Sequence, residues 1–300
     1  MFLLCLLLLY PQGEPFNLRW QFKAGDSFTA ETRSHLTQTV KASGQEFKQD
    51  IIHTTVVKYS VVAVDADGTI VLDQQIESMK ATNPDGSTSV GNNAVLNQLQ
   101  GAIVKAKLTP KLEVKELEGY EELVKRLAGD DPSIRRVVQA ILSEDQLKQA
   151  IHQSLACVPQ QQTPAGTRWQ RNLKLNLGPL GSINSELNYT ASGMAKVDGK
   201  DLVKIDYQPV VKYLPPSADA ANPELSIASG SIQLKEGAGV AYFNQQTGRL
   251  HSSSLRLQLS GEMTAKLQNK PVPLTFEQTQ VIEVRIQNAE ARSQKTEGSK

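Results

Sequence analysis

Two long stretches of the chain alternate between apolar and polar side chains, and this period of two most constrains the fold. The first covers residues 18–83, where apolar residues such as Phe28 and Ala30 fall on every second position. The second begins near Thr167 and continues to Ile286. Such alternation is typical of strands that have one dry face and one wet face. We therefore predict a large antiparallel sheet built from two β-meanders.

Turn residues divide both stretches into shorter strands. In the first stretch we predict hairpin turns at Ser43-Gly44 and Asp65–Gly68, and we expect Asn83–Gly86 to end this meander. In the second we predict turns at three glycine-containing sites: Gly237-Ala238-Gly239, Thr247-Gly248 and Ser260-Gly261. These turns would separate strands over 225–234, 240–243, 250–259 and 263–267. Leu18, Trp20 and Phe22 alternate as a further strand.

The segment between the two stretches has helical spacing. We predict a helix over 92–107, a strand within 108–117, and a short helix over 120–127 that stops at Gly129. Asp131-Pro132 is a typical helix start. Ser143 to Gln146 fits a capping box before another helix, and residues 159–164 have the composition of a linker.

The order of these elements predicts an α+β fold, a large antiparallel β-sheet or half-barrel with a helical insert between its two meanders. We expect a single domain over residues 17–287. Within it, 17–90 form the first meander, 91–158 the mainly helical insert, and 167–287 the second meander. The polar residues 288–300 are expected to be a disordered tail.

The N-terminus has the pattern of an export signal. The apolar run from Phe2 to Tyr10 is shorter than the roughly 20 residues that span a bilayer, and it matches the hydrophobic region of a signal peptide. We expect residues 1–13 to be removed on export to the periplasm or cell surface, leaving no transmembrane segment in the mature chain. A buried N-terminal strand and a lipid anchor at Cys5 are the alternatives.

Composition excludes several classes of function. The formal net charge is +1 and the charges are mixed along the chain, so nothing favours nucleic acid as a partner. Of the two cysteines, Cys5 lies in the leader, which would leave Cys157 unpaired. We interpret Cys157 as a small apolar residue near a helix end rather than a nucleophile.

No pattern of catalytic or metal-binding residues stands out. His35 and His53 could approach each other across the first hairpin, but a metal site needs three or four ligands. His251 precedes three serines, yet no acid in the sequence is placed to orient it. Asp65 and Asp67 resemble the start of a calcium loop whose later ligands are absent. We therefore predict no catalytic residue, metal or cofactor.

Two short motifs carry a resemblance to a known group. The chain has L-R-W-x-F-x-x-G-D-x-F over 18–28 and F-x-x-x-T-G-R-L over 243–250. It resembles a family of uncharacterised exported bacterial proteins, chiefly of Planctomycetes-like type, which has no established activity. At a coarser level it is similar to the half-barrel lipid and lipoprotein carriers of the bacterial periplasm.

Three hypotheses about function remain open. The first is an exported, non-enzymatic protein that binds an apolar ligand, such as an acyl chain, in a groove lined by the sheet. The second is a structural or protein-interaction module of the cell envelope, which would have an envelope protein as its partner. The third is a hydrolase whose site is dispersed along the chain.

Overall fold

The computed structural model describes residues 14–88, 96–176, 181–216, 225–267 and 270–288. Most of them belong to an eleven-stranded antiparallel sheet, whose members are β2 (Ser27–Ala42), β3 (Gln45–Val64), β4 (Ile70–Thr82), β5 (Ile103–Leu108), β6 (Val114–Glu118), β8 (Arg168–Asn176), β9 (Ser182–Val197), β10 (Lys200–Leu214), β11 (Leu225–Asn244), β12 (Arg249–Leu267) and β13 (Lys270–Asn288). A small second sheet pairs β1 (Phe16–Leu18) with β7 (Gln161–Thr163).

The large sheet consists of two meanders joined at its centre. Its strand order is β6-β5-β4-β3-β2-β13-β12-β11-β10-β9-β8. The first meander runs from the central strand β2 outward to β6, and the second runs from the edge strand β8 inward to β13. The two central strands pair over fifteen residues each, from Phe28↔Asn288 to Ala42↔Leu274. The predicted antiparallel sheet with two meanders and helices between them is thus confirmed.

The helices between the meanders are α2 (Tyr120–Ala128), α3 (Pro132–Ile141) and α4 (Glu144–Leu155). Their ends are as the sequence predicts. Gly129 follows the last residue of α2, and the Asp131 side chain accepts hydrogen bonds from the first backbone N–H groups of α3. Ser143 and Gln146 form the capping box of α4. Local sequence therefore determines where these helices begin.

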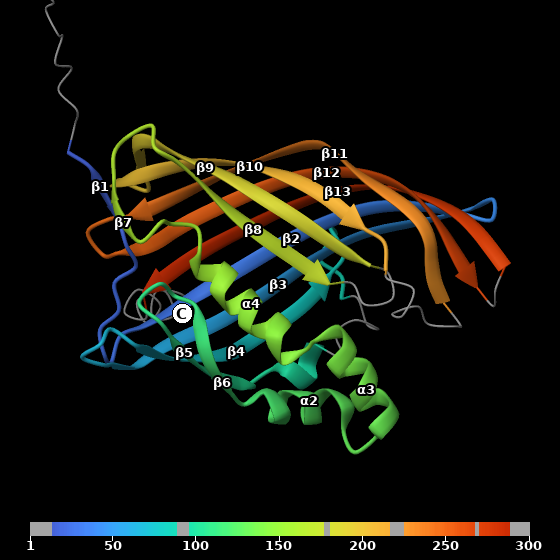
Figure 1. Ribbon diagram of the computed structural model, residues 1–300, viewed down its shortest axis with the longest axis horizontal. Helices are drawn as coiled ribbons and strands as arrows, with labels where there is room; N and C mark the ends of the chain where they lie inside the picture. The colour runs from blue at the N-terminus through green and yellow to red at the C-terminus, as the bar shows by residue number, and fades with distance from the viewer. Residues whose placement is uncertain (1–13, 89–95, 177–180, 217–224, 268–269, 289–300) are drawn as a thin grey trace, which may run out of the picture.

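The sheet curves around α4, which lies across its open side (Figure 1). This helix contacts β6 and β8, the two edge strands of the sheet. The other two helices pack on each other, and α2 contacts β5 beside the same edge. The face of the sheet toward α4, here called the inner face, is the dry face predicted from the alternation.

The core lies between the inner face and α4. Leu155 of the helix is buried there, together with Phe28, Leu72 and Phe243 of the sheet. Trp20 stacks on Phe28 with ring centroids 6.3 Å apart and meets Phe243 edge-on at 6.1 Å. Side chains from both meanders thus share one core, in keeping with the pairing of the two meanders in one large sheet.

Two predicted turns are wrong, because their glycines lie inside long strands. β11 runs without interruption through Gly237 and Gly239, and β12 runs through Gly261. Gly239 is paired with Tyr207 and Gly261 with Phe276, and a Cβ at either glycine would overlap the aromatic ring of its partner. These glycines therefore make room for aromatic rings on the neighbouring strand, a known use of glycine in sheets.

Three other local predictions also need correction. The helix predicted over 92–107 is wrong at its end, because residues 103–108 form β5, while 92–95 lie outside the described residues. The linker predicted over 159–164 contains β7, which pairs with β1. The strand predicted through Trp20 and Phe22 ends at Leu18. In the last two cases a partner distant in sequence decides the structure.

Candidate ligand-binding groove

Over most of their length, the central strands turn no charged side chain toward the inner face. The exception is Lys270 at the start of β13, which pairs with Leu267 and faces inward. Residues that pair across antiparallel strands point to the same face, and neighbours along a strand alternate. Phe28 on β2 faces inward. Starting from it, the rule tells for each residue whether it faces inward or outward, over 28–42 of β2, 45–59 of β3, 253–265 of β12 and 272–286 of β13. No Asp, Glu, Lys or Arg of these ranges faces inward. The outer face of the same strands is strongly charged, with Glu31, Arg33, Lys48, Arg256 and Glu283 among its residues.

Beneath α4 the inner face encloses an apolar cavity of about 220 Å³. Its wall combines residues of the helix, Ser154 and Leu155, with residues of both meanders. The remaining lining is mostly apolar or aromatic and includes Trp20, Phe28, Ala30, Thr32, Tyr59, Cys157, Tyr189, Tyr207, Ala241, Leu255 and Val284. The cavity exceeds the roughly 150 Å³ at which an apolar cavity in a protein core accepts benzene.

Burial shifts the acidity of the polar groups in this cavity. Desolvation raises the pKa of the Cys157 thiol to about 12 and that of the Tyr207 phenol to about 12. Desolvation also raises the pKa values of Tyr59 and Tyr189. For Tyr59 this effect outweighs a hydrogen bond with Ser154, which lowers the pKa. All four groups are therefore neutral near pH 7, which suits the cavity to an apolar ligand.

Beyond α4 the inner face continues as an apolar surface that is only partly covered. Inward side chains there, such as Leu36, Val40 and Phe276, are half-buried, and Phe47 on β3 is 56% exposed. Outward neighbours on the same strands, such as Lys41 and Glu277, are exposed. Together with the cavity, this surface forms a continuous strip of the inner face of the sheet, which we call the inner groove.

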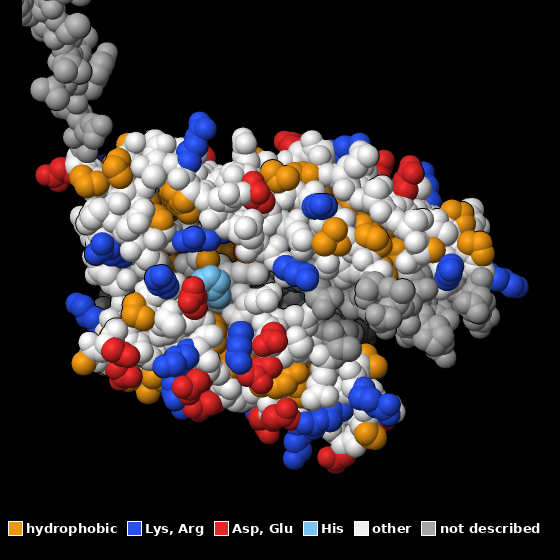
Figure 2. Space-filling model, in the orientation of Figure 1, with side chains coloured by type: hydrophobic (Ala, Val, Ile, Leu, Met, Phe, Trp, Pro, Cys, Tyr) orange, Lys and Arg blue, Asp and Glu red, His pale blue; other side chains and the backbone are white. Residues whose placement is uncertain are grey.

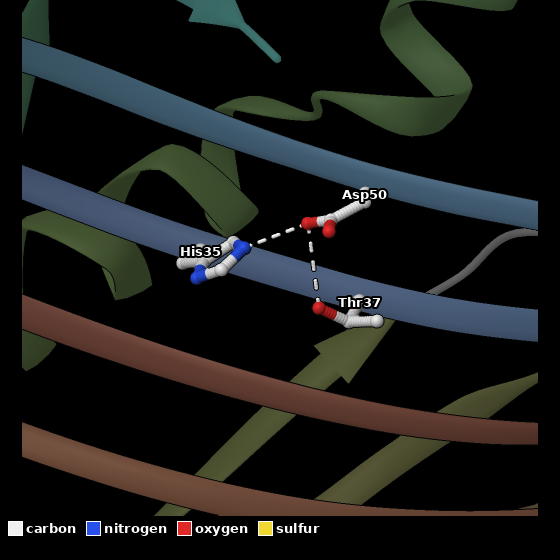
Figure 3. A network of polar contacts seen from close by, with 3 residues as sticks. All are labelled: His35, Thr37 and Asp50. Carbon is white, nitrogen blue, oxygen red and sulfur yellow. Dashed lines mark hydrogen bonds and ion pairs between the residues drawn. The ribbon is translucent and has the colours of Figure 1, made fainter. Parts of the chain in front are cut away.

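The residues considered for catalysis or metal binding lie elsewhere and do not come together. His35 pairs with Ile52 on the outer face, whereas His53 pairs with Ser34 on the inner face. Figure 3 shows His35 beside Asp50, 2.7 Å away, and Thr37 donating to the same carboxylate at 3.4 Å. His152 contacts the carbonyl oxygen of Leu112 at 2.7 Å. Within the described residues, no group of three or more His, Cys, Asp or Glu could hold a metal ion.

The structure adds one pair that the sequence did not indicate. The ring of His251 lies 3.1 Å from Asp198, which belongs to the turn between β9 and β10. The acid comes from a hairpin 53 residues away, so spacing along the chain carried no signal for it. Ser252 lines the same cavity of about 460 Å³ as His251 and Asp198. In the described part of the chain, no hydrogen bond joins His251 to Ser252, Ser253 or Ser254.

The Asp65–Gly68 segment is a hairpin turn, as predicted. Asp67 accepts hydrogen bonds from the backbone N–H and the hydroxyl of Thr69, at 2.9 and 3.0 Å. These bonds lower the pKa of Asp67. They use the oxygens that a calcium ion would need, in keeping with a structural role. Cys5 and the predicted leader lie outside the described residues.

The outer surface differs from the groove in character. Side chains of both charges crowd the surface over α2 and α3 (Figure 2). Among the described helices, none combines the length and the hydrophobicity needed to cross a bilayer. The inner groove therefore stands apart from an otherwise ordinary charged surface.

Three solved structures align with most of the chain at low identity and low TM-score. The structure described as "Lipid-protein interactions in lipovitellin" aligns with 90% of the chain at 9% identity and a TM-score of 0.39, and the chain spans only 26% of that protein. A DUF1329 family protein from Desulfovibrio piger aligns with 83% of each chain at 8% identity and a TM-score of 0.15. A domain from Vibrio parahaemolyticus, described as an outer membrane lipoprotein-sorting protein domain, aligns with 86% of this chain at 9% identity. The alignment covers 85% of that domain, with a TM-score of 0.13.

At these identities the likeness concerns the fold alone. No curated protein sequence matches the chain. One family model matches residues 52–211, which span β3 to β10 and include the helices under the sheet. The chain belongs to the family of unknown function DUF6263.

Proposed function

We propose that this protein is an exported, non-enzymatic binding protein that holds an apolar ligand, of the acyl-chain type, in the inner groove. The observation that carries the proposal is the contrast between the two faces of β2, β3, β12 and β13. One face is charged as a solvated surface normally is. Over residues 28–42, 45–59, 253–265 and 272–286 the other face lacks formal charge even beyond α4, where it is only partly covered.

A sheet face that met only water would gain nothing from losing its charges, and an exposed apolar surface favours association. An apolar ligand in the groove would bury this surface and gain about 25 cal/mol for each Å² removed from water. The cavity beneath α4 extends the groove into the core, and its four ionisable groups are neutral near pH 7. Both features favour an acyl chain over a polar ligand.

A test can use the tryptophan that lines the cavity. A brominated fatty acid quenches indole fluorescence on contact, so its binding in the groove would quench Trp20. In the Trp169→Phe variant, Trp20 is the remaining tryptophan of the chain. We expect saturable quenching in that variant, and competition by an unbrominated fatty acid of the same length.

A matched pair of variants on β2 locates the site. Thr32 faces inward and lines the cavity, whereas Thr39 faces outward on the same strand. Thr32→Phe should weaken binding about tenfold or more by filling the cavity, and Thr39→Phe should not change it. Absence of saturable quenching, or equal effects of the two variants, would refute the proposal. A protein that binds no fatty acid but self-associates through the groove would instead be an interaction module.

A further inference from the structure

Three amide side chains and one hydroxyl form a hydrogen-bonded row across the inner groove. Gln38 donates to Gln278 at 3.0 Å, Gln278 donates to Gln280 at 3.5 Å, and Gln280 donates to Ser34 at 2.9 Å. Ser34 and Gln38 are on β2, and the other two are on β13. All four face inward and are half-buried, and we call them the amide row.

The amide row begins directly beyond the cavity. Thr32 on β2 and Val284 on β13 line the cavity, and Ser34 is the next inward residue after Thr32. One inward step along a strand is two residues, or about 7 Å. The row therefore lies about 7 to 20 Å from the cavity wall along the groove. Farther along the same strands, Val40 and Phe276 make the inner face apolar again.

The cavity is too small for a whole lipid-like molecule. Sites that enclose a complete small ligand are typically about 300 to 1,000 Å³, and this one is about 220 Å³. A ligand whose chain fills the cavity must then extend along the groove. The polar groups that it meets next are those of the amide row and His53 of β3, which pairs with Ser34.

The chemistry of the row selects what can lie there. A primary amide has two N–H donors, and each glutamine of the row uses one of them in the row. Each therefore keeps a donor for a ligand. Around the row these strands turn no Asp, Glu, Lys or Arg inward, and Lys270 lies eight residues from Gln278 along β13. A charged group placed on the row would therefore lose hydration without gaining a counter-ion. An ester, amide or hydroxyl group would lose little hydration and would gain hydrogen bonds.

We infer that the ligand is a neutral amphiphile, whose acyl chain occupies the cavity and whose ester, amide or hydroxyl group lies on the amide row of Ser34, Gln38, Gln278 and Gln280. This inference rests on the proposed function, because it names the class of ligand for the same groove. The amide row is then the part of the groove that distinguishes one acyl compound from another.

Three probes with the same acyl or alkyl length separate the contributions of chain and head group. Decanoylglycerol is neutral and forms hydrogen bonds, decanoate is an anion, and decyltrimethylammonium is a cation without a hydrogen-bonding atom. Their affinities for the full chain can be measured by titration calorimetry below the concentrations at which they form micelles. We expect decanoylglycerol to bind about tenfold more tightly than the other two, the effect of one or two net hydrogen bonds.

Substitutions test whether the amide row causes this preference. Gln278→Met with Gln280→Met keeps the length of both side chains and removes their amides. We expect it to weaken decanoylglycerol about tenfold and to leave decyltrimethylammonium unchanged. Gln258→Met, on the outer face of β12, is the matched control and should change neither. If the double variant fails to fold, Ser34→Ala tests the same row with a smaller change.

The outcomes distinguish the inference from the proposed function. If no probe binds, the proposed function fails and this inference fails with it. If all three bind equally, or if the double variant weakens them equally, the groove binds chains but the amide row does not select the head group. A purely structural role of the row would lower the stability of the variant without changing the ratio of the affinities.

Discussion

The carboxylate of Asp26 accepts a hydrogen bond from the guanidinium of Arg249 at 2.6 Å, and the same guanidinium lies 4.6 Å from the centroid of the Phe28 ring. Asp26 and Phe28 belong to the first sequence motif of the chain, and Arg249 belongs to the second. The backbone N–H of Gln21 also donates to the carbonyl of Gly248 at 2.9 Å. The two motifs are more than 200 residues apart in sequence. Their contacts, here called the joint, connect the start of the first meander with the β11–β12 turn.

This joint should contribute to stability through its ion pair. The Arg249 side chain is only 10% exposed, so removal of its partner leaves a nearly buried charge uncompensated. We expect Asp26→Asn to lower the free energy of unfolding by about 2 kcal/mol. Breaking a fully buried ion pair would cost more, but Asp26 is partly exposed. Urea denaturation followed by circular dichroism measures the change.

The control is an ion pair on the outer face. Arg33 and Glu283 lie 3.9 Å apart, and both side chains are about half exposed. Glu283→Gln should change the free energy of unfolding by less than about 0.5 kcal/mol. Equal effects of the two substitutions would show that the Asp26–Arg249 pair is an ordinary surface contact.

A second prediction concerns the glycine beneath the Tyr207 ring. Gly239→Ala places a methyl group where the ring lies, and should lower the free energy of unfolding by about 1 to 3 kcal/mol. In a double-mutant cycle with Tyr207→Ala, the added cost of Gly239→Ala should largely disappear, because the space is then free. Additive effects in this cycle would mean that the ring does not cause the strain.

The position of α4 across the sheet depends on its capping box. Ser143→Ala removes the side chain that accepts from the Gln146 N–H, and should cost about 1 kcal/mol. Because α4 closes the cavity, we also expect faster hydrogen exchange in this helix and in the cavity-lining part of β3. Unchanged exchange in α4 would argue against this prediction.

High pH should destabilise the fold through the cavity. Burial raises the pKa of Cys157 from 9.0 to about 12 and that of Tyr207 from 10.0 to about 12. The unfolded chain loses these protons at a lower pH than the folded chain, so stability falls as the pH rises from about 9 to about 12. Each shift of one pKa unit corresponds to about 1.4 kcal/mol.

The measurement is the free energy of unfolding in urea at a neutral and at an alkaline pH. Cys157→Ala removes one of the titrating groups and should make the loss of stability at high pH smaller than in the parent chain. The thiol should also react slowly with iodoacetamide in the folded protein. A thiol that reacts as fast as free cysteine at neutral pH would contradict the raised pKa.

The boundaries of α2, α3 and α4 that the sequence indicated could be predicted because short-range contacts determine them. The capping box at Ser143, the cap at Asp131 and the stop at Gly129 each involve residues within about four positions, and their chemistry is the same in any fold. The alternation of apolar and polar residues in β2 and β13 likewise indicates that one face of the sheet is apolar, independently of which segment packs on that face.

The candidate site could be predicted only in outline. The apolar strands and the expected half-barrel pointed to a sheet-lined groove. The amide row was not apparent, because Gln38 and Gln278 lie 240 residues apart and become neighbours only through the β2–β13 register. The Asp198–His251 pair, 53 residues apart, was not apparent for the same reason. A pattern read along one strand contains no information about the residues on the next.

By itself the sequence determined which residues alternate, where helices begin, and that no recognised catalytic motif is present. The tertiary structure alone decided that Gly239 and Gly261 continue strands, that residues 161–163 pair with β1, and which polar groups meet inside the groove. The physical reason is that strand pairing is settled by contacts between distant segments. Aromatic rings, unpaired backbone groups and the dry face of a neighbouring strand can each outweigh the local preference of a glycine or a glutamine.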